Sequence, residues 1–345
     1  DSPVFDDRAW RSVSLAEAPG GALQSQPLPP IRETALIPAP VAITEPASKI
    51  LICDMGVNFT GLASFTFAEL PAGTKLQFRY GELLHQDGSL NPMTSVAGQI
   101  KGMKRAQDGS ETPVGGPGAP PVAWQSDTYF ARGGPEEIYK PTFTFHAFRY
   151  VEITGLPDTS HLSGVVGHRL QSDLPAAGTF DCSNSLLERI DAMCDRTFRS
   201  NIMSVQSDCP HRERFGYGGD LVVTSDAFMM HYDMAEFYAK AARDWADAAR
   251  PDGMLTDTAP FVGIQYCGVG WAMAHPHLLT RLYQYYGDKR LMEEQYTVAS
   301  RWLDLVTAGT PDHIIREGLS DHEALESAPA PVMVTPLYCE SARML

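Results

Sequence analysis

The sequence lacks the features that would place it in several large classes of protein. No apolar run approaches the roughly 18 residues that a membrane-spanning helix needs, so no membrane partner is expected. The 27 Lys and Arg are outnumbered by 42 Asp and Glu, and the net charge of −15 argues against nucleic acid as a partner, because binding to phosphates needs a basic surface. With 43% apolar and 20% charged residues, the 345-residue chain has the composition of a globular protein of two or more domains.

The cysteines form no recognisable metal or disulfide pattern. No pair has CxxC spacing, so we expect free thiols, no metal and no cofactor; the six are Cys53, Cys182, Cys194, Cys209, Cys267 and Cys339. His211 lies close to Cys209, but no second thiol or histidine at ligand spacing completes a metal site. No signal peptide is visible at Asp1; the compartment stays open, with a periplasmic or secreted location favoured over the cytoplasm.

Strand patterns fill the first half of the chain. Residues 74–80 (TKLQFRY) alternate apolar and polar side chains, which is the period of a strand with one solvated face. Aromatic and β-branched residues predict further strands over 62–69, 143–153 and 164–170. Residues 86–125 are rich in Gly, Pro and Ser and lack periodic apolar positions, so we predict a long loop there.

Helical periodicity replaces the strand pattern after Phe180. Residues 183–198 carry apolar side chains at helical spacing, and Ser185 with Glu188 forms a capping-box pattern. The same spacing predicts further helices over 221–231, 234–249, 272–286, 289–307 and 335–345. Because the last pattern runs to the end of the chain without a Gly or Pro stop, we expect the helical domain to be incomplete in this chain.

These patterns divide the chain into three parts. Residues 1–40 are predicted to be a linker or the edge of a preceding β domain. Residues 41–178 are predicted to form a β-sandwich domain, and residues 179–345 an all-α domain.

One short segment between the first two predicted helices is unusually polar. SDCPHRERFGYGGD (207–220) contains glycines that disfavour a continuous helix, so Asp208, Glu213 and Asp220 are expected on an irregular segment at the mouth of the helical scaffold. Acid chemistry on sugars needs one protonated carboxyl group and one carboxylate. Several acids close together, with arginines beside them, can separate their pKa values into those two roles.

Each charged residue of this segment also has a structural explanation. Asp220 precedes an apolar helical run and could be its N-cap. Asp208 could be a turn residue, and Arg212 and Arg214 could form ion pairs with the acids. Residue types and spacing alone therefore leave catalytic and structural roles open.

The same segment resembles the DCPxRERxGWxGD signature of the bacterial α-L-rhamnosidases. Other segments resemble that family in the same order: FDDRAW (5–10), DMGVNFTG (54–61), YGELLHQDGSL (80–90), FTFHAFRYVEITG (143–155) and LYQYYGD (282–288). The resemblance covers essentially the whole chain. It implies a multidomain β + α fold, in which a jelly-roll-like β-sandwich is followed by an (α/α)6 barrel whose N-terminal half would be residues 179–345.

The resemblance also implies a function and a set of site residues. The family consists of inverting glycoside hydrolases, so the implied activity is removal of terminal α-L-rhamnose from a glycoside, an oligosaccharide or a polysaccharide; a homo-oligomer is left open. Glu213 would be the general acid, and Tyr217 stands where the family usually has a Trp. The implied substrate-binding residues are Asp208, Arg212, Tyr217, Asp220, Trp271 and His322. Core packing is the alternative for Trp271.

Two departures from the family pattern leave the aglycone and the linkage open. Residues 272–274 (AMA) replace an acid-containing segment after Trp271, and His322 replaces an aromatic residue. The family's general base is a glutamate of the later barrel, and neither nearby candidate, Glu323 or Glu340, is assigned to that role. We therefore expect the base to lie beyond residue 345, and residues 1–345 alone to be inactive and prone to aggregate.

Two other functions remain as alternatives at this point. A catalytically inactive carbohydrate-binding homologue would fit a chain without an identified base. A polysaccharide lyase on a helical barrel could use Tyr217 and His211 as its acid–base pair.

Overall fold

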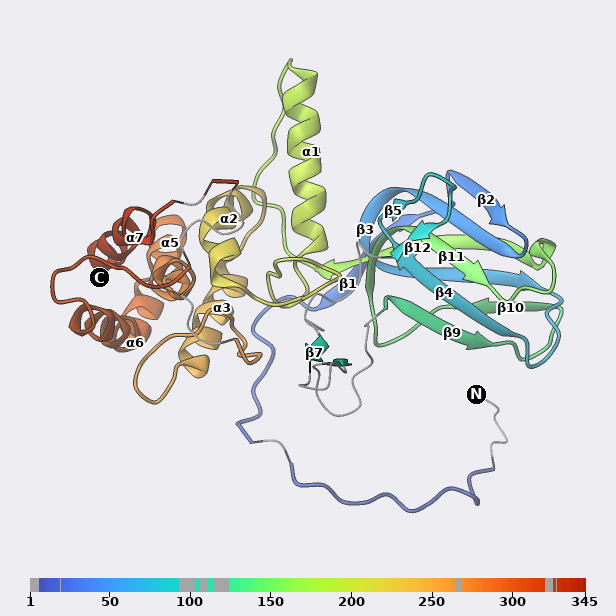
Figure 1. Cartoon of the computed structure of the whole chain (residues 1–345), viewed down its shortest axis with the longest axis horizontal. Coiled ribbons are helices and arrows are strands. Elements are labelled where there is room, and N and C mark those ends of the chain that lie inside the picture. Colours follow the sequence, from blue (N-terminus) through green and yellow to red (C-terminus); the bar gives the residue numbers. More distant parts are fainter. Residues whose placement is uncertain are drawn as a thin grey trace.

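The protein contains a β region followed by a helical region (Figure 1), as the sequence predicts. The structure is a computed structural model, which describes residues 6–18, 20–92, 103–105, 111–113, 124–264, 268–319, 325–326 and 328–345. Each region has a buried apolar core of its own. Within the described ranges, no helix combines the length and the apolar character that crossing a membrane requires.

One long strand, β3 (Ile50–Ala68), organises the main sheet, which has eight strands. Its two edges each pair with two antiparallel strands in succession: β11 then β10 along one edge, and β2 then β12 along the other. The sheet continues from β11 to β4 and β9, and from β12 to β1. The bounds are β1 (Ile31–Ile37), β2 (Ala42–Ala47), β4 (Lys75–Gly81), β9 (Ser126–Phe130), β10 (Glu136–Tyr139), β11 (His146–Thr154) and β12 (Leu162–Ser172).

The predicted alternation in β4 is confirmed. Leu76, Phe78 and Tyr80 are each at most 1% exposed, while the preceding residues Lys75 and Gln77 are exposed. The Phe78 ring stacks on Phe65 of β3 with a centroid separation of 4.2 Å. Side chains on the buried face of β4 thus pack against those of neighbouring strands. Aromatic rings make up much of this core.

Two segments of the β region differ from the expectations. Strand β1 lies within residues 1–40, which we expected to be a linker or the edge of a preceding β domain; it pairs with β12 at the edge of the main sheet. The predicted long loop over 86–125 contains short strands: β6 (Leu90–Asn91) pairs with β5 (Leu83–Leu84), and β7 (Met103–Arg105) pairs with β8 (Glu111–Pro113). Backbone pairing needs no periodic apolar positions, which is why the sequence pattern missed these strands.

The helical region has the predicted helices with shifted ends. Its helices are α1 (Ser185–Ser200), α2 (Gly218–His231), α3 (Ala235–Ala248), α4 (Val269–Ala272), α5 (Ala274–Tyr286), α6 (Lys289–Ala308) and α7 (Ala330–Met344). The cap of α1 is Asn184, whose side chain accepts the Leu186 N–H at 3.0 Å, so the Ser185 capping box is corrected by one residue. The short α4 was not predicted separately, because its sequence continues into α5.

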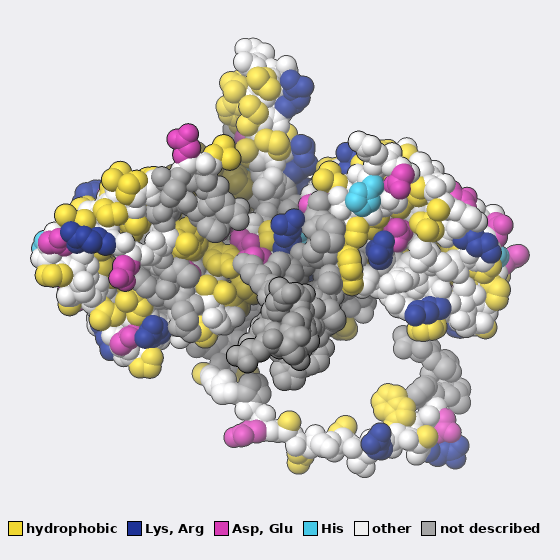
Figure 2. Space-filling model, viewed as in Figure 1, with side chains coloured by type: hydrophobic (Ala, Val, Ile, Leu, Met, Phe, Trp, Pro, Cys, Tyr) yellow, Lys and Arg dark blue, Asp and Glu magenta, His cyan; other side chains and the backbone are white. Residues whose placement is uncertain are grey.

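Helix α1 stands between the two regions, and its N-terminal end projects away from both (Figure 1). Phe198 is its buried residue, whereas Leu186 and Met193 are 55% and 53% exposed. Apolar side chains are accordingly visible on this projecting helix in Figure 2. Its C-terminal end is fixed to the β region, where the Thr60 hydroxyl donates to the Ser200 carbonyl at 2.8 Å. The polar segment 207–220 follows directly, at the junction of the two regions.

Candidate active site

Residues 208–215 form a closed loop between α1 and α2. The Asp208 N–H donates to the Phe215 carbonyl at 3.0 Å, and the Phe215 N–H donates back to Asp208 Oδ1 at 3.1 Å. Within the loop, the Glu213 N–H reaches Cys209 Sγ at 3.2 Å. Burial raises the pKa of the Cys209 thiol to about 11, so it stays protonated near neutral pH. Asp208 therefore closes the loop as a turn residue would, and Cys209 is a packing group of the loop.

The glycines that follow this loop allow close packing. A Cβ atom on Gly216 would overlap the Ala259 carbonyl, and one on Gly218 would overlap the Trp271 carbonyl. On Gly219 it would lie 2.7 Å from the Trp271 indole ring. Gly218 and Gly219 are the first two residues of α2, so the expected irregular segment is confirmed for Asp208 and Glu213 and is wrong for Asp220. Positions 218 and 219 need glycine because the Trp271 carbonyl and indole ring leave no room for a side chain there.

Asp220 lies inside the first turn of α2. The N-cap of this helix is Tyr217, which makes no side-chain capping hydrogen bond, so the alternative explanation of Asp220 as the N-cap is wrong. Asp220 is an acidic residue in the first turn of the helix, where the partial positive charge of the helix dipole stabilises an anion. This placement puts a third acid next to the closed loop.

The loop brings several ionisable side chains together. Burial raises the pKa of Asp208, and the nearby Glu213 carboxylate acts in the same direction. Burial also raises the pKa of Tyr217, whose hydroxyl hydrogen-bonds Glu213 and feels the charges of Asp208 and Asp257. Asp257 is 1% exposed, and its carbonyl accepts the Gly218 N–H at 2.9 Å. No sequence pattern indicates Asp257, because it reaches the site only through tertiary packing.

The remaining expected site residues are placed as follows. Trp271 lies on α4, partly exposed, with its indole against Gly219. Arg212 is exposed at the tip of the loop, and its N–H donates to His211 Nδ1 at 2.9 Å. His322 lies outside the described residues.

The structure also bears on the two candidate bases and on His211 as a possible metal ligand. Glu323 lies outside the described residues, and Glu340 on α7 forms an ion pair with Arg343 at 2.5 Å. His211 Nε2 hydrogen-bonds Glu82 Oε2 at 2.8 Å. In the part of the chain that the structure describes, His, Cys, Asp and Glu side chains form no group of three or more that could hold a metal ion.

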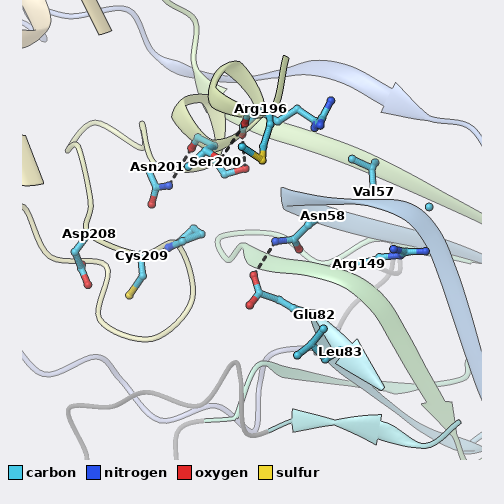
Figure 3. Close-up of a pocket in the computed structure, with 14 residues that line it drawn as sticks. Val57, Asn58, Glu82, Leu83, Arg149, Arg196, Ser200, Asn201, Asp208 and Cys209 are labelled. Carbon is cyan, nitrogen blue, oxygen red and sulfur yellow. Dashed lines mark hydrogen bonds between the residues drawn. The ribbon is translucent and has the colours of Figure 1, made fainter. Parts of the chain in front are cut away.

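A hollow of about 720 Å³ borders the loop on the side of the β region (Figure 3). Asn58 and Glu82 line it from the β region, and Arg196 and Asn201 line it from α1 and its C-cap. Asp208 lies at its edge. Polar and apolar side chains both line it, and it lies where the two regions meet.

Family models match both regions of the chain. Residues 44–170 match the bacterial α-L-rhamnosidase concanavalin-like domain, and residues 175–335 match the bacterial α-L-rhamnosidase six-hairpin glycosidase domain. The two regions thus correspond, in chain order, to a concanavalin-like domain followed by a six-hairpin glycosidase domain. The chain belongs to the bacterial α-L-rhamnosidase family.

Individual relatives agree with this assignment. An α-L-rhamnosidase of Streptomyces avermitilis is 30% identical over 99% of this chain, and the match spans 31% of that relative. The α-L-rhamnosidase structure from Dictyoglumus thermophilum superimposes with a TM-score of 0.84 at 30% identity, covering 99% of this chain and 37% of that one. The Streptomyces avermitilis α-L-rhamnosidase complexed with L-rhamnose gives a TM-score of 0.85 at 28% identity, covering 99% and 31%. The chain thus spans about a third of the length of these relatives.

Proposed function

We propose that this chain is part of an α-L-rhamnosidase that removes terminal α-L-rhamnose from a glycoside, an oligosaccharide or a polysaccharide. The observation that carries the proposal is the closed loop 208–215, which holds Glu213 beside Asp208 and the Tyr217 hydroxyl at the first turn of α2. The family membership of the chain supports it, as does the relative of known structure that was solved with L-rhamnose.

Glu213 is the proposed proton donor to the glycosidic oxygen. It extends from a loop whose backbone is fixed at both ends, and the Tyr217 hydroxyl orients its carboxyl group. Burial raises the pKa of the neighbouring Asp208 above its usual value. A second carboxylate would activate water on the opposite face of the sugar, roughly 6.5–9.5 Å from the donor, and the product would have inverted configuration.

The proposed sugar contacts surround this donor. Asp208, Arg212 and Asp220 supply charged groups that can bind the hydroxyl groups of rhamnose. Tyr217 and Trp271 supply rings that can cover the apolar face of the sugar and its methyl group. Trp271 is packed against Gly219 in the first turn of α2, so the aromatic surface is fixed relative to Asp220.

The lyase alternative needs a free histidine, and His211 does not provide one. The Arg212 N–H donates to Nδ1, and Nε2 is hydrogen-bonded to Glu82, so both ring nitrogens are engaged. A base with neither nitrogen open to substrate cannot abstract a proton from it.

Hydrolysis of an aryl α-L-rhamnoside by the full-length protein tests the proposal. We expect turnover of this substrate and none of the matched aryl β-D-glucoside, with the β-anomer of rhamnose appearing first in the proton NMR spectrum. Release of the α-anomer first would contradict inversion. Binding of rhamnose without turnover would favour the carbohydrate-binding alternative, and an unsaturated product from a uronate polymer would favour a lyase.

A further inference from the structure

The loop that carries Glu213 belongs to the helical region in sequence, but the β region holds it on both sides of Glu213. His211, two residues before Glu213, hydrogen-bonds Glu82, which lies between β4 and β5. Arg214, the residue after Glu213, donates to the Phe145 carbonyl just before β11 at 2.8 Å. The proposed acid thus lies between two contacts that cross from one region to the other.

The first contact is a chain of three hydrogen bonds with a defined direction. The Arg212 N–H donates to His211 Nδ1 at 2.9 Å, so Nδ1 must be the acceptor nitrogen and the ring is the neutral tautomer with its hydrogen on Nε2. That hydrogen is donated to Glu82 Oε2 at 2.8 Å. The other oxygen of Glu82 accepts from Asn58 Nδ2 of β3 at 2.7 Å, which Figure 3 shows as a dashed line. The chain connects β3 to the backbone beside Glu213.

The second contact fixes a strained residue. Arg214 has a φ of 60°, a left-handed conformation that a residue with a side chain keeps only when its surroundings enforce it. Its guanidinium donates to the Pro210 carbonyl at 3.0 Å and lies 4.0 Å from the centre of the Phe145 ring. Gln125 lies within 3.4 Å of the same guanidinium and is itself bonded to both backbone groups of Ala147 on β11.

We propose that Glu82 of the β region, acting through His211, is a positioning residue for the acid–base chemistry of the loop, and that Arg214 fixes the other side of the same turn. The inference rests on the proposed role of Glu213 as proton donor. It assigns the β region a part in the reaction, although none of these three side chains needs to touch the substrate.

The first experiment measures Glu82→Ala in the full-length protein with two rhamnosides, one with a poor and one with an activated leaving group. Because proton donation matters most when the leaving group is poor, kcat for that substrate should fall about 10- to 100-fold with KM little changed, and the activated substrate should lose much less. Glu82→Gln should restore most of the activity, since its carbonyl can still accept the hydrogen of the neutral His211 ring.

The matched control is Glu152→Ala, which breaks the ion pair of Glu152 with Arg79 inside the β region. The Glu152 side chain is 9% exposed and that of Glu82 is 24% exposed, so the control removes the more buried carboxylate. It should lower the melting temperature without changing the ratio of the two substrates. Equal loss for both substrates in Glu82→Ala, or the same change of ratio in Glu152→Ala, would overturn the proposal.

The second experiment does not depend on activity. Cys209 Sγ accepts the Glu213 N–H, so the rate at which Cys209 is alkylated reports opening of the loop. Alkylation mapped by mass spectrometry should accelerate at least about tenfold in Glu82→Ala, as expected when a hydrogen bond to a charged group is lost. Glu82→Gln and Glu152→Ala should stay near the wild-type rate.

The two experiments separate the two proposals. A wild-type protein that hydrolyses neither rhamnoside would overturn the proposed function, and faster alkylation in Glu82→Ala would still support the positioning of the loop by the β region. An unchanged alkylation rate in Glu82→Ala would overturn the positioning inference, whatever the activity of the wild type.

Discussion

The aromatic core of the main sheet and helix α1 bury their apolar side chains to different degrees. In the β region Phe65, Phe67 and Phe78 are each at most 1% exposed. On α1, Leu186 and Leu187 are 55% and 47% exposed, although this helix has a clear apolar pattern. An amphipathic pattern therefore predicts that a helix forms, but it does not say what the apolar face contacts.

The candidate catalytic acids and the groups that hold them in place also come from different regions of the chain. The acids of the candidate site follow α1 in sequence, next to a helix with an exposed apolar face. Their loop is fixed by the Glu82 side chain and the Phe145 carbonyl, both at the ends of β strands. A loop that belongs to the helical region in sequence is thus positioned by contacts from the β region.

The largest expected effect is on activity, in the loop itself. Glu213→Gln keeps the shape of the side chain but has no proton to donate, so turnover of a substrate with a poor leaving group should fall about 10²- to 10⁴-fold. Activated aryl rhamnosides should lose less, and the melting temperature should change little. Steady-state kinetics with both substrates check this, and equal losses would count against Glu213 as the donor.

Truncation of a core ring should have the largest effect on stability. Phe78→Ala removes a fully buried ring that stacks on Phe65, and should lower the free energy of unfolding by about 3–5 kcal/mol. Phe143→Ala is the control, because that ring is fully exposed and should change stability by less than about 0.5 kcal/mol. Urea unfolding of the β region checks both, and similar losses would show that the core is not where the structure places it.

Acid should weaken the helical region before the β region. Burial lowers the pKa of His275 and His277 to about 4, below the usual 6.5, so the unfolded chain binds more protons and stability falls as pH drops from about 6.5 to 4. Each pKa unit corresponds to about 1.4 kcal/mol. In the β region hydrogen bonds from Arg149 lower the pKa of Asp54, whose contribution is present above its unfolded pKa and is lost only as pH falls through the lower folded value.

Tryptophan fluorescence can follow this difference in a variant with Trp10→Phe and Trp124→Phe, because the other three tryptophans, Trp245, Trp271 and Trp302, lie in the helical region. The urea midpoint measured by fluorescence should fall between pH 7 and pH 4.5, and His277→Gln should reduce that fall. A midpoint independent of pH over this interval would contradict the assignment of two neutral, buried histidines.

The smallest expected effect is on the exposed face of α1. Leu187→Ser should change the free energy of unfolding by less than about 0.5 kcal/mol, because the side chain is already 47% exposed. Phe198→Ala in the same helix should cost several times more, since that ring packs on Phe228 with a centroid separation of 4.1 Å. A loss above about 2 kcal/mol for Leu187→Ser in the full-length protein would mean that the apolar face of α1 is covered there.

Local patterns predicted the elements but not the contacts between them. The alternation of β4 and the periodicity of α6 follow from residues adjacent in sequence, and both are confirmed. The start of α2 was placed three residues late, because glycine spacing suggested a flexible turn where the structure needs room for Trp271. Short strands such as β7 depend on backbone pairing and leave no apolar signal.

The candidate site shows the same division. The segment 207–220 stands out in the sequence by its composition and by its resemblance to a family signature. Asp257 and Glu82 lie far from it in sequence and reach it only through packing of other elements. Asp257 has no neighbouring motif. Glu82 lies within YGELLHQDGSL (80–90), a segment that resembles the family, but no local pattern there indicates its contact with His211.

The two hydrogen bonds that join the β region to the loop 208–215 affect how domains of such proteins can be exchanged. An exchange of the β region for that of a distant relative would have to preserve an acceptor where Glu82 meets His211 and a carbonyl where Phe145 meets Arg214. A hybrid that folds well but lacks these two partners would carry every residue of the acidic loop and still hold it in the wrong place. The boundary between the two regions is therefore a poor point for cutting and joining genes unless those partners travel with the helices.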